Sequence, residues 1–153
     1  DRDHLRRLLV QNRCGCLQNS VWISPRDLRP IFADLSAAAA VEDLAHLFEA
    51  RTVLGRGSRR VGAEAWDFVA INGAHERFQR EVGEALAVVR KGRLTAEGLT
   101  ALIRQELQAY RAVIESDPLL PRGLAPPDYA GSDTYTAHVR FVEAVRRTET
   151  AFA

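Results

Sequence analysis

The chain has 153 residues, of which 46% are hydrophobic and 27% are charged, and its formal net charge is +1. This is the composition of a folded protein, long enough for one sizeable core or two small ones. No apolar run approaches the ~18 residues of a membrane span and the chain does not start with a signal-peptide pattern, so we expect a cytoplasmic protein without membrane contact. The nearly balanced charge argues against strong DNA binding by this region itself.

The first third of the sequence changes between helical and strand patterns. Leucines spaced by three and four predict a short amphipathic helix over residues 3–13. Residues 17–24 combine β-branched and aromatic side chains around a polar centre, which predicts a hairpin turning at 18–20. Helical spacing returns over residues 28–35 and runs on through a series of alanines, and residues 45–53 predict a further strand.

The order helix, hairpin, helix, strand is that of a ferredoxin-like βαββαβ unit without its first strand. We therefore predict an α+β protein with a partial ferredoxin-like domain over residues 1–54. The first strand is central in that topology, and its loss would leave a sheet edge unpaired. This gap and the absence of methionine predict that the chain is part of a longer protein.

Residues 55–62 are rich in glycine and arginine and predict a linker. Residues 63–153 have helical spacing, and three apolar stripes predict helices over residues 71–89, 99–114 and 135–145, which would form a small all-helical domain. Between the last two helices, residues 117–131 contain four prolines and predict an extended segment, called the strap below. We expect its leucines to hold it against the helices.

Two residue types give little support to a metal or redox site. Cys14 and Cys16 are too close for an ordinary disulfide, and the four histidines have no metal-ligand spacing, so we expect reduced thiols and neither a metal nor another cofactor. Trp22 and Trp66 are expected to be core residues, each with a partner for its indole N–H.

Several short motifs occur together in this order: Trp22-Ile23-Ser24-Pro25, Ala65-Trp66-Asp67, Tyr110-Arg111, Asp117-Pro118-Leu119-Leu120-Pro121 and Asp128-Tyr129-Ala130-Gly131. The set resembles the PaaX family of bacterial repressors of phenylacetate catabolism and related pathways, and the resemblance covers nearly the whole chain. It implies a central ferredoxin-like domain, similar to small nucleases of CRISPR adaptation, and a C-terminal helical domain. An N-terminal winged helix that binds DNA would be missing. The sequence departs from the family at two places, since Asp-Tyr-Ala-Gly replaces the usual Asp-Trp-Pro-Gly and Cys14 replaces a usual aromatic residue.

The resemblance implies an effector of the acyl-coenzyme A type, whose phosphates require cations. Arg104 and Arg111 lie seven residues apart beside Tyr110, and Arg146 with Arg147 could approach from the last helix. The alternative is that these arginines form ion pairs with nearby glutamates. Arg56, Arg59 and Arg60 are candidates for contact with a phosphate or a DNA backbone, with a solvated linker as the alternative.

We therefore expect the effector-sensing and dimerising region of a PaaX-like repressor of aromatic or related catabolic genes. It would form a C2 homodimer, bind operator DNA through the missing winged helix and release it when an acyl-coenzyme A or similar catabolic effector binds. The alternative is an interaction or assembly module without an effector, whose open sheet edge pairs with a partner. Enzymatic activity is not expected, because a nuclease of this kind would place its carboxylates on the missing first strand.

Overall fold

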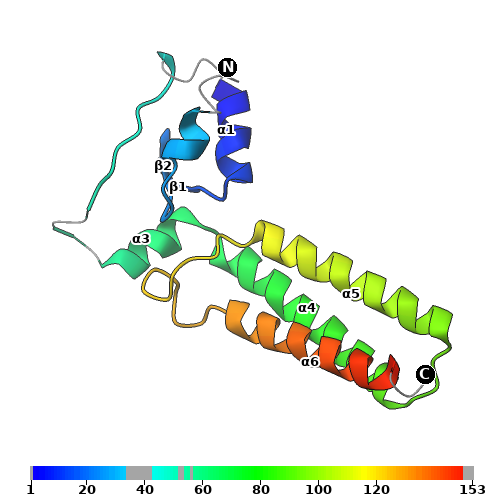
Figure 1. Cartoon of the computed structure of the whole chain (residues 1–153). Helices are drawn as coiled ribbons and strands as arrows, with labels where there is room; N and C mark the ends of the chain where they lie inside the picture. Colours follow the sequence, from blue (N-terminus) through cyan, green and yellow to red (C-terminus); the bar gives the residue numbers. More distant parts are fainter. Residues whose placement is uncertain (1, 34–42, 52–53, 56, 150–153) are drawn as a thin grey trace. The chain divides into compact units, whose positions relative to one another are not determined.

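The computed structural model describes residues 2–33, 43–51, 54–55 and 57–149 (Figure 1). The chain forms two compact units. Unit 1 comprises Asp1–Asp67 and Leu120–Pro127, and unit 2 comprises Phe68–Leu119 and Asp128–Ala153. The chain therefore passes between the units after residues 67, 119 and 127, and the middle of the strap belongs to unit 1.

Unit 1 begins with helix α1 (Arg2–Gln11) and a hairpin of strands β1 (Gly15–Gln18) and β2 (Val21–Ile23). The strands are antiparallel, with Gly15 opposite Ile23 and a turn at residues 19–20. Leu5 on α1 packs with apolar residues that include Ile31 and Phe32. The predicted first helix and hairpin are confirmed.

The next two predicted elements have different outcomes. Residues 29–33 are helical as predicted, and the rest of that predicted helix lies outside the described residues. Residues 45–51 have no regular structure, so the prediction of a strand over 45–53 is wrong for that part. A strand needs a neighbour for its backbone groups, and among the described residues the sheet consists of β1 and β2 alone. The coarse fold class, α+β, agrees with the structure, while the ferredoxin-like topology stays a prediction.

Residues 58–62, predicted as part of a linker, instead begin helix α3 (Ser58–Ala65). The sequence of α3 has no clear stripe of large apolar residues, because the two residues that this helix buries, Gly62 and Ala65, are small. Gly62 lies so close to the Leu124 carbonyl that an added Cβ would stand 2.5 Å from that oxygen. The strap therefore packs against α3 at this point, whereas we expected its leucines to contact the helical domain.

Trp66, which follows α3, is half-buried against the hairpin. An added Cβ on Gly15 of β1 would overlap the indole ring, so only glycine allows this approach. The indole Nε1–H donates to the Arg13 carbonyl oxygen at 3.3 Å. The structure thus agrees with the prediction that Trp66 has a packing role and a partner for its N–H.

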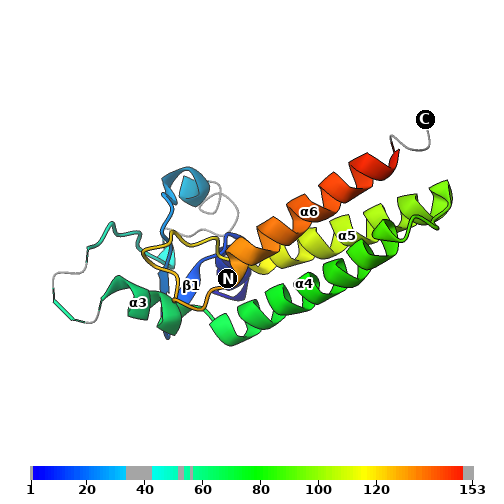
Figure 2. The same cartoon turned by 90° about the horizontal axis from the view of Figure 1, so that it is seen from below.

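Unit 2 consists of helices α4 (Phe68–Arg90), α5 (Ala96–Ser116) and α6 (Gly131–Glu149). Both views show the three helices side by side, with α4 and α6 running in the same direction and α5 in the opposite one (Figures 1 and 2). Their shared core contains Phe78, Val82, Leu99 and Phe141. Within the described ranges, no helix combines the length and apolar character needed to cross a membrane. The three predicted helices are confirmed, each extending a few residues beyond its apolar stripe.

Candidate functional site

A group of buried and half-buried polar side chains joins α4 to both ends of the strap. We call His75, Gln79, Asp117, Tyr129 and Thr134 the strap cluster. His75, Asp117 and Thr134 are 0%, 1% and 0% exposed. His75 comes from the apolar face of α4, Asp117 directly follows α5, and Thr134 lies in the first turn of α6.

His75 lies at the centre of the strap cluster. Its Nε2 is 2.8 Å from Asp117 Oδ2, and its Nδ1 is 2.8 Å from Thr134 Oγ1. Gln79 Nε2 donates to Thr134 Oγ1 at 3.2 Å. One assignment of protons satisfies the chain of contacts: Gln79 donates to Thr134, Thr134 donates to His75 Nδ1, and His75 Nε2–H donates to Asp117.

The Asp117 carboxylate accepts two further hydrogen bonds, from the Tyr129 hydroxyl at 2.5 Å and from the Leu119 backbone N–H at 2.6 Å. Burial by itself raises the pKa of Asp117, but the hydrogen bonds from His75, Tyr129 and Leu119 outweigh it and hold this pKa below the ordinary value. Burial, followed by the hydrogen bond to Asp117, raises the pKa of Tyr129 well above its ordinary value. At neutral pH the pair is therefore a carboxylate and a neutral phenol that donates to it.

Asn72, one turn before His75 on α4, holds the returning end of the strap. Its Nδ2 donates to the Asp128 carbonyl oxygen at 3.2 Å, and its Oδ1 accepts from the Ala130 N–H at 3.1 Å. Gly131 follows directly, and a Cβ at this position would overlap the Tyr129 ring. This explains on physical grounds why the Asp-Tyr-Ala-Gly motif ends in glycine.

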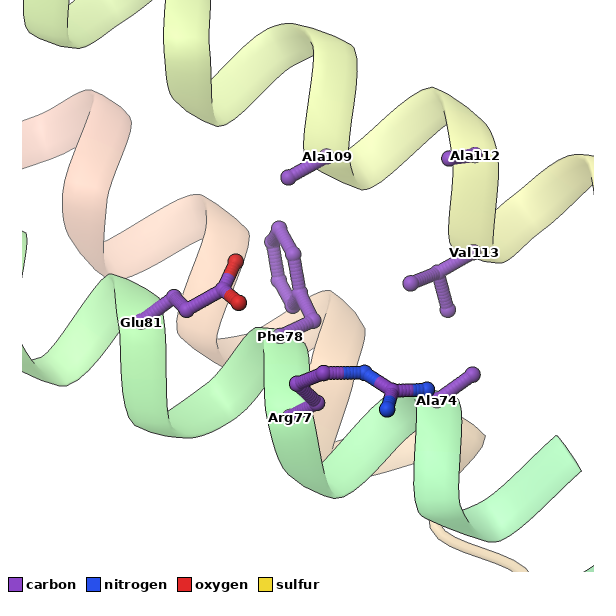
Figure 3. A pocket seen from close by; sticks show the side chains of 7 residues that line it. All are labelled: Ala74, Arg77, Phe78, Glu81, Ala109, Ala112 and Val113. Carbon is purple, nitrogen blue, oxygen red and sulfur yellow. The ribbon is translucent and has the colours of Figure 1, made fainter. Parts of the chain in front are cut away.

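A shallow groove of about 220 Å³ lies between α4 and α5. Its walls are mostly apolar and small, with the Phe78 ring between the helices and charged side chains on the α4 side (Figure 3). The lining residues are Ala74, Arg77, Phe78, Glu81, Ala109, Ala112 and Val113. The volume is below the 300–1,000 Å³ of typical ligand pockets, so the groove can accept a ring-sized apolar group but not a whole coenzyme.

A second pair of histidine and carboxylate joins α5 to α6. Glu106 is 6% exposed, and its Oε1 lies 2.7 Å from His138 Nδ1. The Tyr110 ring stacks on the His138 ring, with centroids 4.0 Å apart and planes 7° from parallel. Burial, together with Tyr135 and Glu106 nearby, raises the pKa of Tyr110. This predicted effector-binding residue is therefore part of the packing between α5 and α6.

The structure does not bring the predicted effector-binding arginines into one site. Arg104 and Arg111 are exposed on one face of α5, and Arg111 Nε lies 4.0 Å from Glu115 Oε1. Arg146 and Arg147 are near the end of α6, eight and nine residues beyond His138. His138 contacts Glu106, and α6 runs opposite to α5, so Arg111 and Arg146 lie on opposite sides of this contact along the bundle. At a rise of about 1.5 Å per residue, the two arginines are roughly 20 Å apart along the bundle axis.

The arginines proposed for phosphate or DNA contact have separate environments. Arg59 and Arg60 are exposed on α3, where Arg60 Nε lies 3.0 Å from Glu64 Oε1. Arg56 lies outside the described residues. Arg147 Nη2 also lies 3.8 Å from Glu143 Oε2. Arg60, Arg111 and Arg147 therefore each form an ion pair with a glutamate four residues away on the same helix, as the alternative interpretation expects for Arg111 and Arg147.

Sequence reasoning missed the strap cluster, although it singled out two of its residues within motifs. Asp117 and Tyr129 belong to the strap motifs, but nothing in one sequence connects them to His75, 42 residues earlier than Asp117. One signal was present: His75 lies at helical spacing between Ile71 and Phe78 on an apolar stripe. A buried histidine needs hydrogen-bond partners, and the polar residues at the helix ends are where such partners come from.

Comparison with known proteins gives two family matches. Residues 1–61 match the central Cas2-like domain of PaaX protein, and residues 66–153 match the C-terminal domain of PaaX-like proteins. A search of the curated proteins found no match. The two domain matches occur in the order implied by the motifs and together cover nearly all of the sequence, so the chain belongs to the PaaX family.

Proposed function

We propose that this chain is the effector-sensing and dimerising region of a PaaX-like transcriptional repressor. The observation that carries the proposal is the pair of matches to the central and C-terminal PaaX domains. In the proposal, operator DNA is bound by a winged helix outside this chain, and the whole repressor is a cytoplasmic C2 homodimer. The two-fold symmetry of an operator is read by two identical subunits.

The effector in this proposal is an acyl-coenzyme A, and its acyl group enters the groove between α4 and α5. The groove volume of about 220 Å³ suits an aromatic ring, and its wall of alanines leaves space beside Phe78. Arg77 on the α4 side supplies a guanidinium group for the thioester carbonyl or a phosphate (Figure 3). Arg104 and Arg111 share the exposed face of α5 and would supply the cations only for a ligand bound outside the groove.

The experiment is a thermal-shift titration of the whole protein with phenylacetyl-coenzyme A, free coenzyme A and phenylacetate. A ligand of the native state at a hundredfold excess over its dissociation constant stabilises the protein by about 2.7 kcal/mol. We expect a shift with the thioester that exceeds the shift with either component. No shift with any acyl thioester would refute the effector class.

Variants then test the site. Ala112→Leu fills the groove and is expected to abolish the thioester shift, and Arg77→Gln is expected to weaken it. Arg104→Gln and Arg111→Gln are matched controls, because each removes an arginine whose side chain is not part of the groove lining. Loss of the shift in these two variants, with retention in Ala112→Leu, would place the ligand on the outer face of α5 and refute the groove.

One observation favours the alternative, an interaction module without a small-molecule effector. Large apolar side chains are exposed between residues 44 and 54, including Phe48 at 78% and Leu54 at 95% exposure. These residues are neighbours in sequence, and exposed apolar side chains that form a patch are typical of surfaces that another chain covers. Sedimentation velocity of the original protein and of the Phe48→Ser and Leu54→Ser variants tests this alternative. It requires that the original protein associates and that the variants lose this association.

A further inference from the structure

Helix α4 holds both ends of the part of the strap that lies in unit 1. The strap leaves unit 2 after Leu119 and returns at Asp128. On the leaving side, His75 binds Asp117, and the Asp117 carboxylate also accepts from the Leu119 N–H. On the returning side, Asn72 binds the Asp128 carbonyl and the Ala130 N–H.

The strap has few backbone hydrogen bonds of its own to resist opening. Within residues 120–127, Leu124 and Ala125 donate to the Pro121 carbonyl at 2.8 and 3.1 Å. Prolines at four strap positions have no N–H to donate. Helices α4, α5 and α6, in contrast, have continuous backbone hydrogen bonds and a shared apolar core. Segments with few such bonds open at lower free energy than the core beside them.

The contacts that hold the strap ends are polar and few in number, and the contact between His75 and Asp117 is buried. Asp117 is the acceptor for three donors, from His75, Tyr129 and Leu119. In the closed state Asp117 and its donors are all paired. In a partly opened state some of these groups would stay buried without a partner, which raises the free energy of that state. The arrangement therefore favours full closure or full opening over intermediate positions.

We propose that the strap cluster is a latch: its hydrogen bonds keep the strap closed, and the strap opens as one segment while α4, α5 and α6 stay folded. Opening releases Asp117 from His75 and Tyr129. A ligand or partner with a different affinity for the open and the closed strap can select one of these two states. The latch is a property of this chain and does not depend on the effector proposed above.

Arg122 provides a direct probe of strap opening. It is exposed in the turn of the strap and is followed by Gly123, so trypsin cleaves after it once the segment leaves its folded path. When opening and closing are fast compared with cleavage, the cleavage rate follows the population of the open state. Mass spectrometry of the whole protein after brief digestion separates cleavage after Arg122 from cleavage elsewhere.

Two variants weaken the latch by different amounts. Tyr129→Phe keeps the ring, which packs edge-on against His75 with centroids 5.7 Å apart, and removes one donor to Asp117. His75→Gln removes the imidazole that joins Asp117 to Thr134. We expect cleavage after Arg122 to be about tenfold faster in Tyr129→Phe, the effect of one lost hydrogen bond, and faster still in His75→Gln. Amide hydrogen exchange at Leu119 and Ala130 should accelerate with it, with helical circular dichroism unchanged.

His138→Gln is the matched control. It removes a histidine that is also bound to a buried carboxylate in unit 2, but this pair joins α5 to α6 and includes no strap residue. We expect its Arg122 cleavage rate to remain within twofold of the original protein. Equal acceleration in His138→Gln, no acceleration in Tyr129→Phe, or helix unfolding in step with cleavage would each overturn the latch. If His75→Gln does not fold, the Tyr129→Phe comparison decides alone.

Discussion

The buried pair between α5 and α6 provides a quantitative test of how this protein uses charge. Glu106 is almost fully buried and binds His138 Nδ1 at 2.7 Å. Replacing Glu106 with alanine leaves the His138 N–H without its acceptor and removes the packed methylene groups of the glutamate. The His138 side chain is 22% exposed, so water compensates in part. We expect a loss of about 2–4 kcal/mol in unfolding free energy, between the cost of one unsatisfied donor and that of a broken buried ion pair.

Two further variants separate the causes of this loss. Glu106→Gln keeps the volume and one acceptor oxygen, and should cost about 1 kcal/mol. Glu115→Ala lies on the same helix and removes an ion pair with Arg111 in which both side chains are mostly exposed, at 4.0 Å. Exposed pairs contribute about 0–1 kcal/mol, so this control should change stability little.

Urea denaturation followed by circular dichroism at pH 7 measures all three variants. The midpoint reports stability, and an unchanged slope shows that the comparison remains valid. Because small proteins have only about 5–15 kcal/mol of stability, the expected loss in Glu106→Ala is readily visible. A Glu106→Ala variant that loses no more than Glu115→Ala would refute the reasoning that burial decides the value of the pair.

Three further predictions follow from the strap cluster and the glycines. The folded state holds the pKa of Asp117 below its ordinary value of 3.8. The ionised carboxylate therefore stabilises the protein above that pH, and this stabilisation is lost as the pH falls through the pKa of the folded state. When the unfolding free energy is measured against pH, it should fall less steeply in acid for Asp117→Asn than for the original protein. Gly83→Ala on α4, where an added Cβ meets nothing within 4 Å, should raise the unfolding free energy by about 0.5–1 kcal/mol in a chemical melt. Gly62→Ala forces a Cβ against the Leu124 carbonyl and should lower it by about 1–3 kcal/mol in the same melt, and a neutral result would contradict the close packing of α3 on the strap.

The helices of unit 2 could be predicted from the sequence because their signal is local. Apolar residues repeat at helical spacing along α4, α5 and α6, and Thr95 accepts from the Gly98 N–H at the start of α5, as a cap does. The hairpin of β1 and β2 was equally visible, since its strands are adjacent in the sequence. The family was predicted from motifs, which require no tertiary information.

Where sequence reasoning failed, the deciding contact lies elsewhere in the chain. Residues 45–51 have apolar residues suited to a strand, but a strand forms only where another strand pairs with it. Residues 58–62 have a composition typical of a linker, yet they begin a helix. Its small residues pack against the hairpin, at Ala65, and against the strap carbonyl of Leu124, at Gly62. Local propensity is weak compared with such packing.

The sequence by itself determined the family, the helical second half of the chain and the hairpin. The tertiary structure alone decided which polar residues meet. It separated Arg111 from Arg146 along the bundle, and it joined His75 of α4 to Asp117 at the end of α5 and to Thr134 at the start of α6. The physical reason is that the apolar stripe of a helix repeats along neighbouring residues and can be read locally. A buried hydrogen bond depends on two groups that are far apart in the chain, and a single sequence does not show which distant groups lie close together in space.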